Sequence, residues 1–507
     1  MLVKGKKAMV ASAHKLISQT GIEVLKNGGN AVDASVAMAL TAGVVLPDMC
    51  SIGGDAFMLY YSKKNHQVYS INGSGKLPKN YNYDDPMTKY GMKSVTVPGC
   101  VSVLYRALEL WGTQKFEQLS TDAIYLSRDG VEASRLVRRH METDYDALSK
   151  SQTASKIYLN NLKPLQVGEK IYNEDYAKTL EYLNQAGVEG FYKGDIAKKI
   201  VEHSQKNGGY FELEDFSEYE CELLEPIHIN YRGYEVYQSA PVSQGYLHLL
   251  ELAILNHFDL EKMSEARRTH ILIEAKKIAF NKREFAYNHL KEALSKEYTQ
   301  KLATLINEQS NNTIDDPYYT ENGHTTSFVV VDENGDAVSF ILSIAGVWGS
   351  LEVVDGTGIL LNNRAGVGLN SNPHSPNYIK KRQQSIHTLN TWLVFKQDQL
   401  KYVGNTPGGD YQVMWNMQII SRLIDEKMNA YEAVSATKWR SNYDGVHHLE
   451  LEENVDQEVV EDLKSRGHDI KIIPKYGASG ASEVIEITID GLEGGNDPRS
   501  DGNCLAI

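Results

Sequence analysis

The feature that most constrains the fold is a pair of apolar segments joined by a tight turn near the middle of the chain. SFVVVD, which begins at Ser327, and AVSFILS, which begins at Ala337, flank the turn ENGD. The pair Asn334 and Gly335 in that turn is a strong β-hairpin signal. Both segments are almost continuously apolar, which predicts strands buried on both faces and sheets covered by helices on both sides.

The rest of the chain extends this pattern. A second strand pair, TWLVFK and LKYVGN, precedes the turn TPGGD (406–410) and a helix predicted from Tyr411. Earlier in the chain, Asn30 is expected to cap a helix whose N-terminus is also favoured by the charge of Asp33. SIGGDAFMLYYS (51–62) predicts a glycine turn followed by a strand. Residues 264 to about 296 predict one long, charged helical region.

Composition narrows the classes of function. The chain has 507 residues, and its 42% hydrophobic and 23% charged residues are typical of globular proteins. A net charge of −14 repels nucleic acid and anionic membranes, so neither is expected as a partner. The four cysteines match no metal-ligand spacing, which favours a reducing compartment. The N-terminus lacks the apolar core of a signal peptide, so we expect a cytoplasmic protein.

A polar stretch leads directly into the hairpin. Residues 307–324, NEQSNNTIDDPYYTENGH, predict an exposed, mobile segment that ends at Thr325 and Thr326. A threonine hydroxyl becomes an effective nucleophile when its own α-amino group serves as the base, which here requires cleavage of the His324–Thr325 bond. The alternative is an ordinary strand start, because threonine is a good strand former.

Three further segments carry candidate chemistry. Gly408 and Gly409 in TPGGD lie between a strand and a helix, where backbone N–H groups can stabilise an oxyanion, although a plain tight turn has the same pattern. QQSIHTLN (383–390) places Ser385 near His387, but no GxSxG motif accompanies them, so His387 is interpreted as a polar group that fixes its surroundings. GVHHLE (445–450) has no third ligand at a metal-site spacing.

Several segments, taken in order, resemble the γ-glutamyltransferase (glutathione hydrolase) family over nearly the whole chain. They are GGNAVDASVAMALTAGVVLPDMCSIGGDAFML, SVTVPGCVSVLYRALELWGT, GFYKGDIAKKIV, TTSFVVVDENGDAVSF, GTGILLNNR, TPGGD and DPRSDG. The resemblance implies an α/β (α+β) protein with the four-layer αββα fold of N-terminal-nucleophile hydrolases, in which two mainly antiparallel sheets lie between helical layers. It also implies a proenzyme that cleaves itself into residues 1–324 and 325–507, both parts of one intertwined domain.

The resemblance also assigns roles to residues. Thr325 is the implied nucleophile, because its spacing to DENGDAVS fits the new N-terminus better than that of Thr326. Ser343 stands where a second hydroxyl residue, usually Thr, steadies the nucleophile, and Gly408 and Gly409 stabilise the oxyanion. Water or an acceptor amine releases the acyl group. No metal or organic cofactor is implied. The implied partners are a small-molecule substrate and the two fragments as a heterodimer, with a higher oligomer left open.

The expected glutamate pocket departs from the family pattern. Arg364 stands where an amide or acid is expected, Val367 where an aspartate is expected, and Ala345 where an asparagine is expected. The family's paired serines are reduced to Ser385 followed by Ile386. The catalytic centre is therefore predicted to be kept, while the pocket that holds the acyl group is rebuilt.

The new pocket is expected to depend on Arg364. Its planar fork suits a substrate carboxylate, and the alternative is an internal ion pair with an acid such as Asp410. The family's carboxylate-binding arginine has no clear match, and Ser74 and Lys76 lie near its place. The predicted substrate-binding residues are Asn363, Arg364, Ser385, His387, Asp410 and Lys76.

Three functions remain open at this stage. The first is a self-processing amidohydrolase or acyltransferase that acts on γ-glutamyl amides such as glutathione. The second keeps the fold and the nucleophile but acts on a different acyl amide, as cephalosporin-acylase-like relatives do. The third is a protein of this fold that no longer cuts itself and serves in binding.

Overall fold

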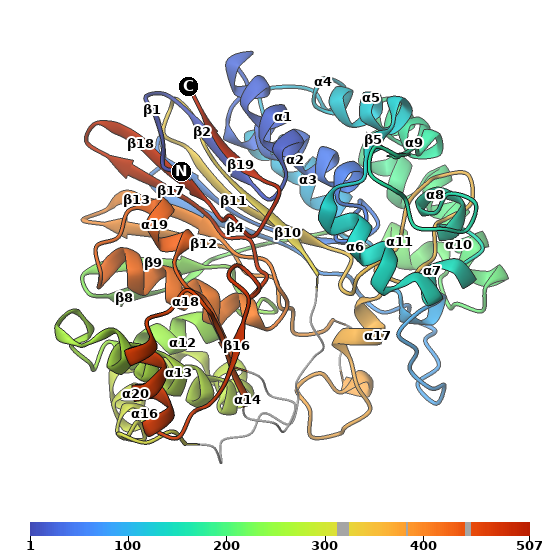
Figure 1. Ribbon diagram of the computed structural model, residues 1–507. Coiled ribbons are helices and arrows are strands. Elements are labelled where there is room, and N and C mark those ends of the chain that lie inside the picture. The colour runs from blue at the N-terminus through green and yellow to red at the C-terminus, as the bar shows by residue number, and fades with distance from the viewer. Residues whose placement is uncertain (312–323, 382–383, 442–447) are drawn as a thin grey trace.

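Two β-sheets stacked face to face, with helices on both outer sides, form the centre of the computed structural model (Figure 1). The structure describes residues 1–311, 324–381, 384–441 and 448–507. Every strand pair within the two sheets is antiparallel. The layers therefore run helix, sheet, sheet, helix, which confirms the predicted αββα architecture.

Sheet I contains the predicted hairpin and has the strand order β19-β2-β10-β11-β3-β4-β7. Its strands are β2 (Met9–Ser12), β3 (Asp55–Ser62), β4 (Gln67–Gly73), β7 (Glu222–Leu224), β10 (Thr326–Val331), β11 (Ala337–Ser343) and β19 (Asn503–Ala506). Sheet II has the order β1-β18-β17-β13-β12-β9-β8. Its strands are β1 (Val3–Gly5), β8 (Ile227–Tyr231), β9 (Tyr234–Gln238), β12 (Trp392–Lys396), β13 (Gln399–Asn405), β17 (Glu483–Thr488) and β18 (Gly491–Asn496).

The hairpin between β10 and β11 forms as its sequence predicts. Gly335 adopts a φ of 81°, and the Asp332 carboxylate accepts hydrogen bonds from the backbone N–H groups of Asn334 and Asp336 at 2.9 and 3.0 Å. Every residue of both strands is buried. The expectation of strands covered on both faces is thus confirmed.

Three apolar cores separate the four layers. Alternate residues of the strands face inward, where Leu59 and Val329 of sheet I meet Leu393 and Ile485 of sheet II. The outer face of sheet I packs against the helices that follow β2 and β4, and the outer face of sheet II packs against the helices that follow β9 and β13. Because burial on both faces excludes water, polar groups at the ends of these strands must be paired within the protein.

The helices fall into two groups, which lie on opposite sides of the sheets in Figure 1. The first group is α1 (Lys15–Lys26), α2 (Ala31–Val45), α3 (Cys100–Trp111), α4 (Phe116–Leu119), α5 (Thr121–Asp129), α6 (Arg135–Thr143), α7 (Tyr145–Lys150), α8 (Ala154–Tyr158), α9 (Glu174–Tyr192), α10 (Asp195–Lys206) and α11 (Leu213–Ser217). The second is α12 (Gly245–Leu255), α13 (Glu265–Asn281), α14 (Arg283–Asn288), α15 (Leu290–Ala293), α16 (Lys296–Ala303), α18 (Tyr411–Ile424), α19 (Ala430–Ser435) and α20 (Gln457–Ser465). A short helix, α17 (Arg364–Gly368), follows the LLNN segment.

Local sequence signals decide where several of these helices begin. Asn30 caps α2 as predicted, and its side chain and that of Asp33 form a reciprocal capping box. The helical region expected over residues 264–296 is confirmed, and it is divided among four helices, α13 to α16. Ser295 starts the last of them, where its hydroxyl accepts the backbone N–H of Tyr298.

Two small sheets complete the secondary structure. They are β5 (Val131–Glu132) with β6 (Lys170–Ile171), and β14 (Trp439–Ser441) with β15 (His448–Glu452) and β16 (Asp469–Ile473). No helix among the described residues has the length and apolar character needed to cross a membrane. Of the predicted mobile stretch 307–324, residues 312–323 lie outside the described part of the chain.

Candidate active site

A row of polar side chains crosses one end of sheet I. The register pairs the residue after Thr325 with the residue before Ser343, so these two lie level with each other, and Ser343 lies opposite Asp55 on β3. Opposite residues of an antiparallel pair point to the same face of the sheet. Val329, four residues from Thr325, faces the inter-sheet core. Thr325, Ser343 and Asp55 therefore point into the end of the layer between the two sheets.

The Ser343 hydroxyl is the centre of the contacts around Thr325. Its Oγ donates a hydrogen bond to the backbone carbonyl oxygen of His324 at 2.8 Å and accepts one from the N–H of Ala345 at 2.8 Å. Thr325 Oγ1 lies 3.3 Å from the same atom and donates to it. These three contacts use the single O–H and both lone pairs of the Ser343 hydroxyl. Ser343 thus touches both the predicted nucleophile and the carbonyl group of the bond predicted to be cut.

The backbone around His324 is held in place from both sides. The N–H of His324 donates to the carbonyl oxygen of Ala345 at 3.0 Å. Ala345 itself has a φ of 76°, a conformation that a residue with a Cβ rarely adopts, so its two hydrogen bonds hold a strained turn. The His324 ring packs edge-on against His140, with ring centroids 4.8 Å apart. The peptide bond before Thr325 is therefore fixed rather than free in solvent.

The TPGGD turn follows β13, whose end is joined to the hairpin. The Asn405 side chain donates to Ser339 Oγ at 3.1 Å and to the carbonyl oxygen of Phe340 at 3.3 Å. Gly408 and Gly409 have φ angles of 133° and 59°. A Cβ at Gly408 would lie 2.4 Å from the ring of Trp415, so this position accepts only glycine without rearrangement. The assignment of an oxyanion site to these two glycines stays a prediction.

A buried charged cluster lies beside the row. Asp55 Oδ1 accepts the N–H of Gly75 at 2.8 Å, and its Oδ2 lies 3.0 Å from His387 Nε2 and 3.6 Å from Arg364 Nε. Burial and the nearby Arg364 charge lower the pKa of His387 to about 4, so its ring is neutral near pH 7. Because a carboxylate only accepts, the ring proton resides on Nε2 and points to Asp55. Burial also lowers the pKa of Arg364, against the opposing effect of Asp55.

Several polar atoms of this cluster have no hydrogen-bond partner among the described residues. They are Arg364 Nε, Ser385 Oγ, His387 Nδ1 and Ser74 Oγ, all in residues that are at most 4% exposed. Ser385 lies near Arg364, because a Cβ placed on Gly368 would meet Ser385 Oγ at 2.9 Å and Arg364 Cδ at 3.0 Å. Buried polar atoms without partners are costly in a folded protein and are typical of binding sites.

The other predicted residues occupy different places. Asp410 forms an ion pair with Arg283 at 3.0 Å, and Arg364 forms one with Asp55 at 3.6 Å, so the internal ion pair given as the alternative role of Arg364 is made with Asp55. Asn363 is fully buried and has a structural role, since it accepts the N–H of Gly346 at 2.7 Å and donates to the carbonyl of Lys89 at 2.9 Å. Lys76 is half-buried. Sequence analysis missed Asp55, although an acid that opens the apolar strand DAFMLYYS signals a buried partner.

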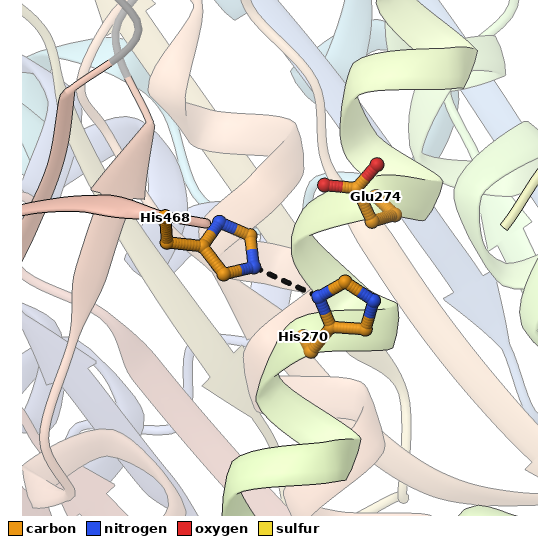
Figure 2. Close-up of side chains that lie close together, drawn as sticks. All are labelled: His270, Glu274 and His468. Atoms are coloured by element: carbon orange, nitrogen blue, oxygen red, sulfur yellow. Dashed lines mark hydrogen bonds between the residues drawn. The ribbon is translucent and has the colours of Figure 1, made fainter. Parts of the chain in front are cut away.

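One group of side chains has the composition of a metal site. His270, Glu274 and His468 are all buried, and their ligand atoms lie within 4.8 Å of one another (Figure 2). They come from α13 and from the turn after α20, away from Thr325 in the sequence. The weaker candidate GVHHLE lies mostly outside the described residues. No metal was predicted from the sequence.

The four-layer fold, with a hydroxyl residue at the end of the inter-sheet layer, is that of an N-terminal-nucleophile hydrolase. The crystal structure of cephalosporin acylase from Bacillus halodurans has this fold and matches with a TM-score of 0.92 at 29% identity, over 100% of this chain and 97% of that one. The family model for gamma-glutamyltranspeptidase matches residues 17–507. The chain therefore belongs to the gamma-glutamyltranspeptidase family, whose members are enzymes.

Two relatives match over almost their full length. The chain is 32% identical to the glutathione hydrolase-like YwrD proenzyme of Bacillus subtilis (strain 168), over 100% of this chain and 99% of the relative. It is 28% identical to the glutathione hydrolase proenzyme of Escherichia coli (strain K12), over 98% of this chain and 91% of the relative. Both relatives are named as proenzymes.

Proposed function

We propose that this chain is a proenzyme that cuts its own His324–Thr325 bond and then uses Thr325 as the nucleophile of an amidohydrolase or acyltransferase. The observation that carries the proposal is the Ser343 hydroxyl, which contacts both Thr325 Oγ1 and the carbonyl oxygen of His324. The proenzyme names of its relatives support the same reading.

The cut begins with attack of Thr325 Oγ1 on the carbonyl carbon of His324. Ser343 donates a hydrogen bond to the carbonyl oxygen, which stabilises the negative charge that develops there. The C–N bond then breaks as the nitrogen, which keeps its own proton, also takes the proton lost by Thr325 Oγ1, and an ester joins His324 to the threonine oxygen. Water hydrolyses this ester, which leaves a carboxylate on residue 324 and a free α-amino group on Thr325.

The mature enzyme repeats this chemistry on a substrate. The new amino group takes the proton from Thr325 Oγ1, which attacks the amide carbonyl, and Gly408 and Gly409 supply N–H groups for the oxyanion. The amine leaves with that proton, and an acyl ester remains on Thr325. Water or a second amine then releases the acyl group. The proposed primary substrates are γ-glutamyl amides such as glutathione, in line with the names of its relatives.

A second candidate substrate is favoured by the cluster around Arg364. A γ-glutamyl group carries an α-carboxylate and an α-ammonium group, so its pocket needs a cation and an acid. Arg364 supplies a guanidinium whose buried Nε has no hydrogen-bond partner among the described residues. The nearby acids are already paired, because Asp55 faces Arg364 and His387, and Asp410 faces Arg283. Val367 stands where the family has an acid. An acyl group that ends in a carboxylate and has no ammonium fits these charges better.

The two fragments remain together in this proposal as a heterodimer. Both sheets contain strands of residues 1–324 paired with strands of residues 325–507, as where β2 lies between β19 and β10. The proposal also includes a cytoplasmic location. It includes neither nucleic acid nor a membrane as a partner, and it leaves a higher oligomer open. The net charge of −14 is the support for excluding nucleic acid.

Cleavage is tested on purified protein by a denaturing gel and by N-terminal sequencing. We expect two fragments, of 324 and 183 residues from the chain of 507, with Thr325 as the new N-terminus. Thr325→Ala should leave the chain intact. Thr326→Ala is the matched control and should still be cut, since Thr326 Oγ1 has no hydrogen-bond partner among the described residues. A wild-type chain that stays intact on long incubation would contradict the proposal.

The two substrate classes are separated by a matched pair of anilides. γ-Glutamyl-p-nitroanilide and glutaryl-p-nitroanilide differ only in the α-ammonium group. Faster release of nitroaniline from the first supports the γ-glutamyl reading, and faster release from the second supports the carboxylate-only reading. If fully cut protein turns over neither compound, both substrate proposals are wrong.

A further inference from the structure

The histidine pair between α13 and the turn after α20 has unusual surroundings. His270 Nδ1 and His468 Nε2 face each other at 2.8 Å, as Figure 2 shows, and Glu274 lies one helical turn from His270 on the same face of α13. All three side chains are buried. Two imidazoles and one carboxylate, with i, i+4 spacing on a helix, are a ligand set that zinc uses in proteins.

Further hydrogen bonds hold His270 and Glu274 in fixed orientations. His270 Nε2 lies 2.8 Å from the carbonyl oxygen of Asn307, so its proton is on Nε2 and Nδ1 carries the lone pair. Glu274 Oε2 accepts the N–H of Asn311 at 3.0 Å, which leaves this oxygen a second lone pair. Metal-bound histidines and carboxylates are commonly held by such outer contacts.

The His468 ring donates its Nε2 proton to His270 Nδ1. This proton need only move from Nε2 to Nδ1 of His468 to present a second lone pair to an ion.

We propose that His270, Glu274 and His468 bind a divalent transition-metal ion, with Zn²⁺ as the ion that best suits the set. The ion takes the place of the proton shared by the two rings. Since Zn–N bonds are about 2.0–2.1 Å, the two nitrogens separate by roughly 0.5 Å to reach tetrahedral spacing. His468 follows Gly467, whose φ is 86°, so the ring sits on a turn rather than within a helix or strand.

Charge at the site is compatible with a cation. Lys277 Nζ lies 2.8 Å from Glu274 Oε1, on the oxygen that does not contact Asn311. The two nearby arginines are paired with acids, Arg466 with Asp462 at 2.5 Å and Arg267 with Glu308 at 2.7 Å. The metal therefore binds through the free lone pair of Oε2, while Lys277 stays on Oε1.

The position of the ligands gives the metal a role if the proposed cleavage occurs. His270 and Glu274 belong to residues 1–324, and His468 belongs to residues 325–507. A bound ion would thus join the two fragments by coordinate bonds. This consequence rests on the proposed function, whereas metal binding itself does not.

The test uses the full-length, untagged protein and Co²⁺ as the spectroscopic probe, with Zn²⁺ as competitor. We expect visible absorption bands of tetrahedral Co²⁺ that Zn²⁺ abolishes, and a rise in Tm of about 2–5 °C when free Zn²⁺ exceeds the dissociation constant about 100-fold. Glu274→Gln and His468→Gln should each weaken binding at least ~100-fold, because loss of even an outer contact costs about 10–100-fold.

The matched control is His203→Gln, which alters another buried histidine that faces a glutamate, Glu352, at 2.8 Å but belongs to no metal-like cluster within the described part of the chain. It should leave Co²⁺ binding unchanged. Equal Co²⁺ spectra and Zn²⁺ affinities in the wild type and in both ligand variants would mean adventitious binding and overturn the proposal, as would no binding by the wild type. Measurement on the uncut Thr325→Ala chain separates metal binding from cleavage, since both forms should bind.

Discussion

The two halves of the candidate active site, the residues around Thr325 and the cluster around Arg364, satisfy their polar groups differently. Beside Thr325, the proton and both lone pairs of the Ser343 hydroxyl are used in hydrogen bonds to a hydroxyl and to backbone groups. Around Arg364 there are formal charges, and Arg364 Nε, Ser385 Oγ and His387 Nδ1 are buried without hydrogen-bond partners among the described residues, while Arg364 Nε lies 3.6 Å from Asp55.

The residues around Thr325 are therefore suited to bond cleavage, and the cluster around Arg364 is suited to binding a ligand. A self-contained network holds its geometry before any substrate arrives, as bond cleavage within the chain requires. Unpaired buried groups cost free energy until a ligand satisfies them, so they favour a ligand of matching charge. The first half is also where the sequence keeps the family pattern, and the second is where it departs.

The largest expected effect is at the shared hydroxyl. Ser343→Ala removes the donor to the His324 carbonyl and should slow cleavage by about 10²–10³-fold, the usual cost of one oxyanion donor. A gel time course measures this rate. Ser343→Thr keeps the hydroxyl and should restore cutting. Equal rates for Ser343→Ala and the wild type would show that the network around Thr325 is not needed for cleavage.

The second-largest effect should be on the use of substrate and not on cleavage of the chain. Arg364→Gln removes the cation that faces Asp55, and kcat/KM for the preferred anilide should fall by about 10–100-fold while the chain is still cut. Lys76→Gln is the comparison, since Lys76 is the other cation predicted near this pocket. A larger loss in Lys76→Gln than in Arg364→Gln would transfer the anion-binding role to Lys76.

Lowering the pH should reduce the free energy of unfolding through the cluster around Arg364, which contains His387, more than through the residues around Thr325. His387 has its pKa lowered from 6.5 to about 4, so the unfolded chain binds more protons between these values and stability falls as pH drops through them. Between about pH 7 and pH 5 this costs about 2 kcal/mol. Denaturant unfolding should show that His387→Asn loses about 2 kcal/mol less than the wild type over that interval.

The wild type is the reference for this measurement. If His387→Asn and the wild type have the same acid dependence, the neutral, buried state assigned to His387 is wrong.

The smallest effect should be on the preference for γ-glutamyl over glutaryl substrates. Val367 is half-buried in α17 and stands where the family has an aspartate. Val367→Asp should raise the ratio of γ-glutamyl to glutaryl turnover by about 10-fold, because a new carboxylate can face the α-ammonium group. Val367→Asn, which has similar size and no charge, should leave the ratio within about 3-fold. An equal gain in Val367→Asn would exclude the charge as its cause.

Local signals predicted the scaffold well. Asn334 and Gly335 fixed the hairpin through a turn geometry that few residues adopt, and Asn30 with Asp33 fixed the start of α2 through backbone hydrogen bonds a few residues away. These features depend on neighbours in the sequence. The stacking of the two sheets followed from strands that are almost continuously apolar and are buried at every position.

Contacts between distant residues could not be predicted in this way. Asp55 lies opposite Ser343 only because β3 and β11 are neighbours, and nothing near Arg364 in the sequence indicates that its partner is Asp55 rather than Asp410. His270 and His468 meet across 198 positions. Their side chains are brought together by packing, which a single sequence does not display.

The pairing of strands across the proposed cut has a consequence for a cleaved protein. β2 of residues 1–324 is paired on both edges with strands of residues 325–507, β19 and β10, and sheet II pairs β1 with β18 and β9 with β12 across the same division. The halves can part only if both sheets come apart, so partners do not exchange between folded molecules. A molecule with a damaged nucleophile therefore keeps that half for as long as it stays folded, and mixing with intact copies does not repair it.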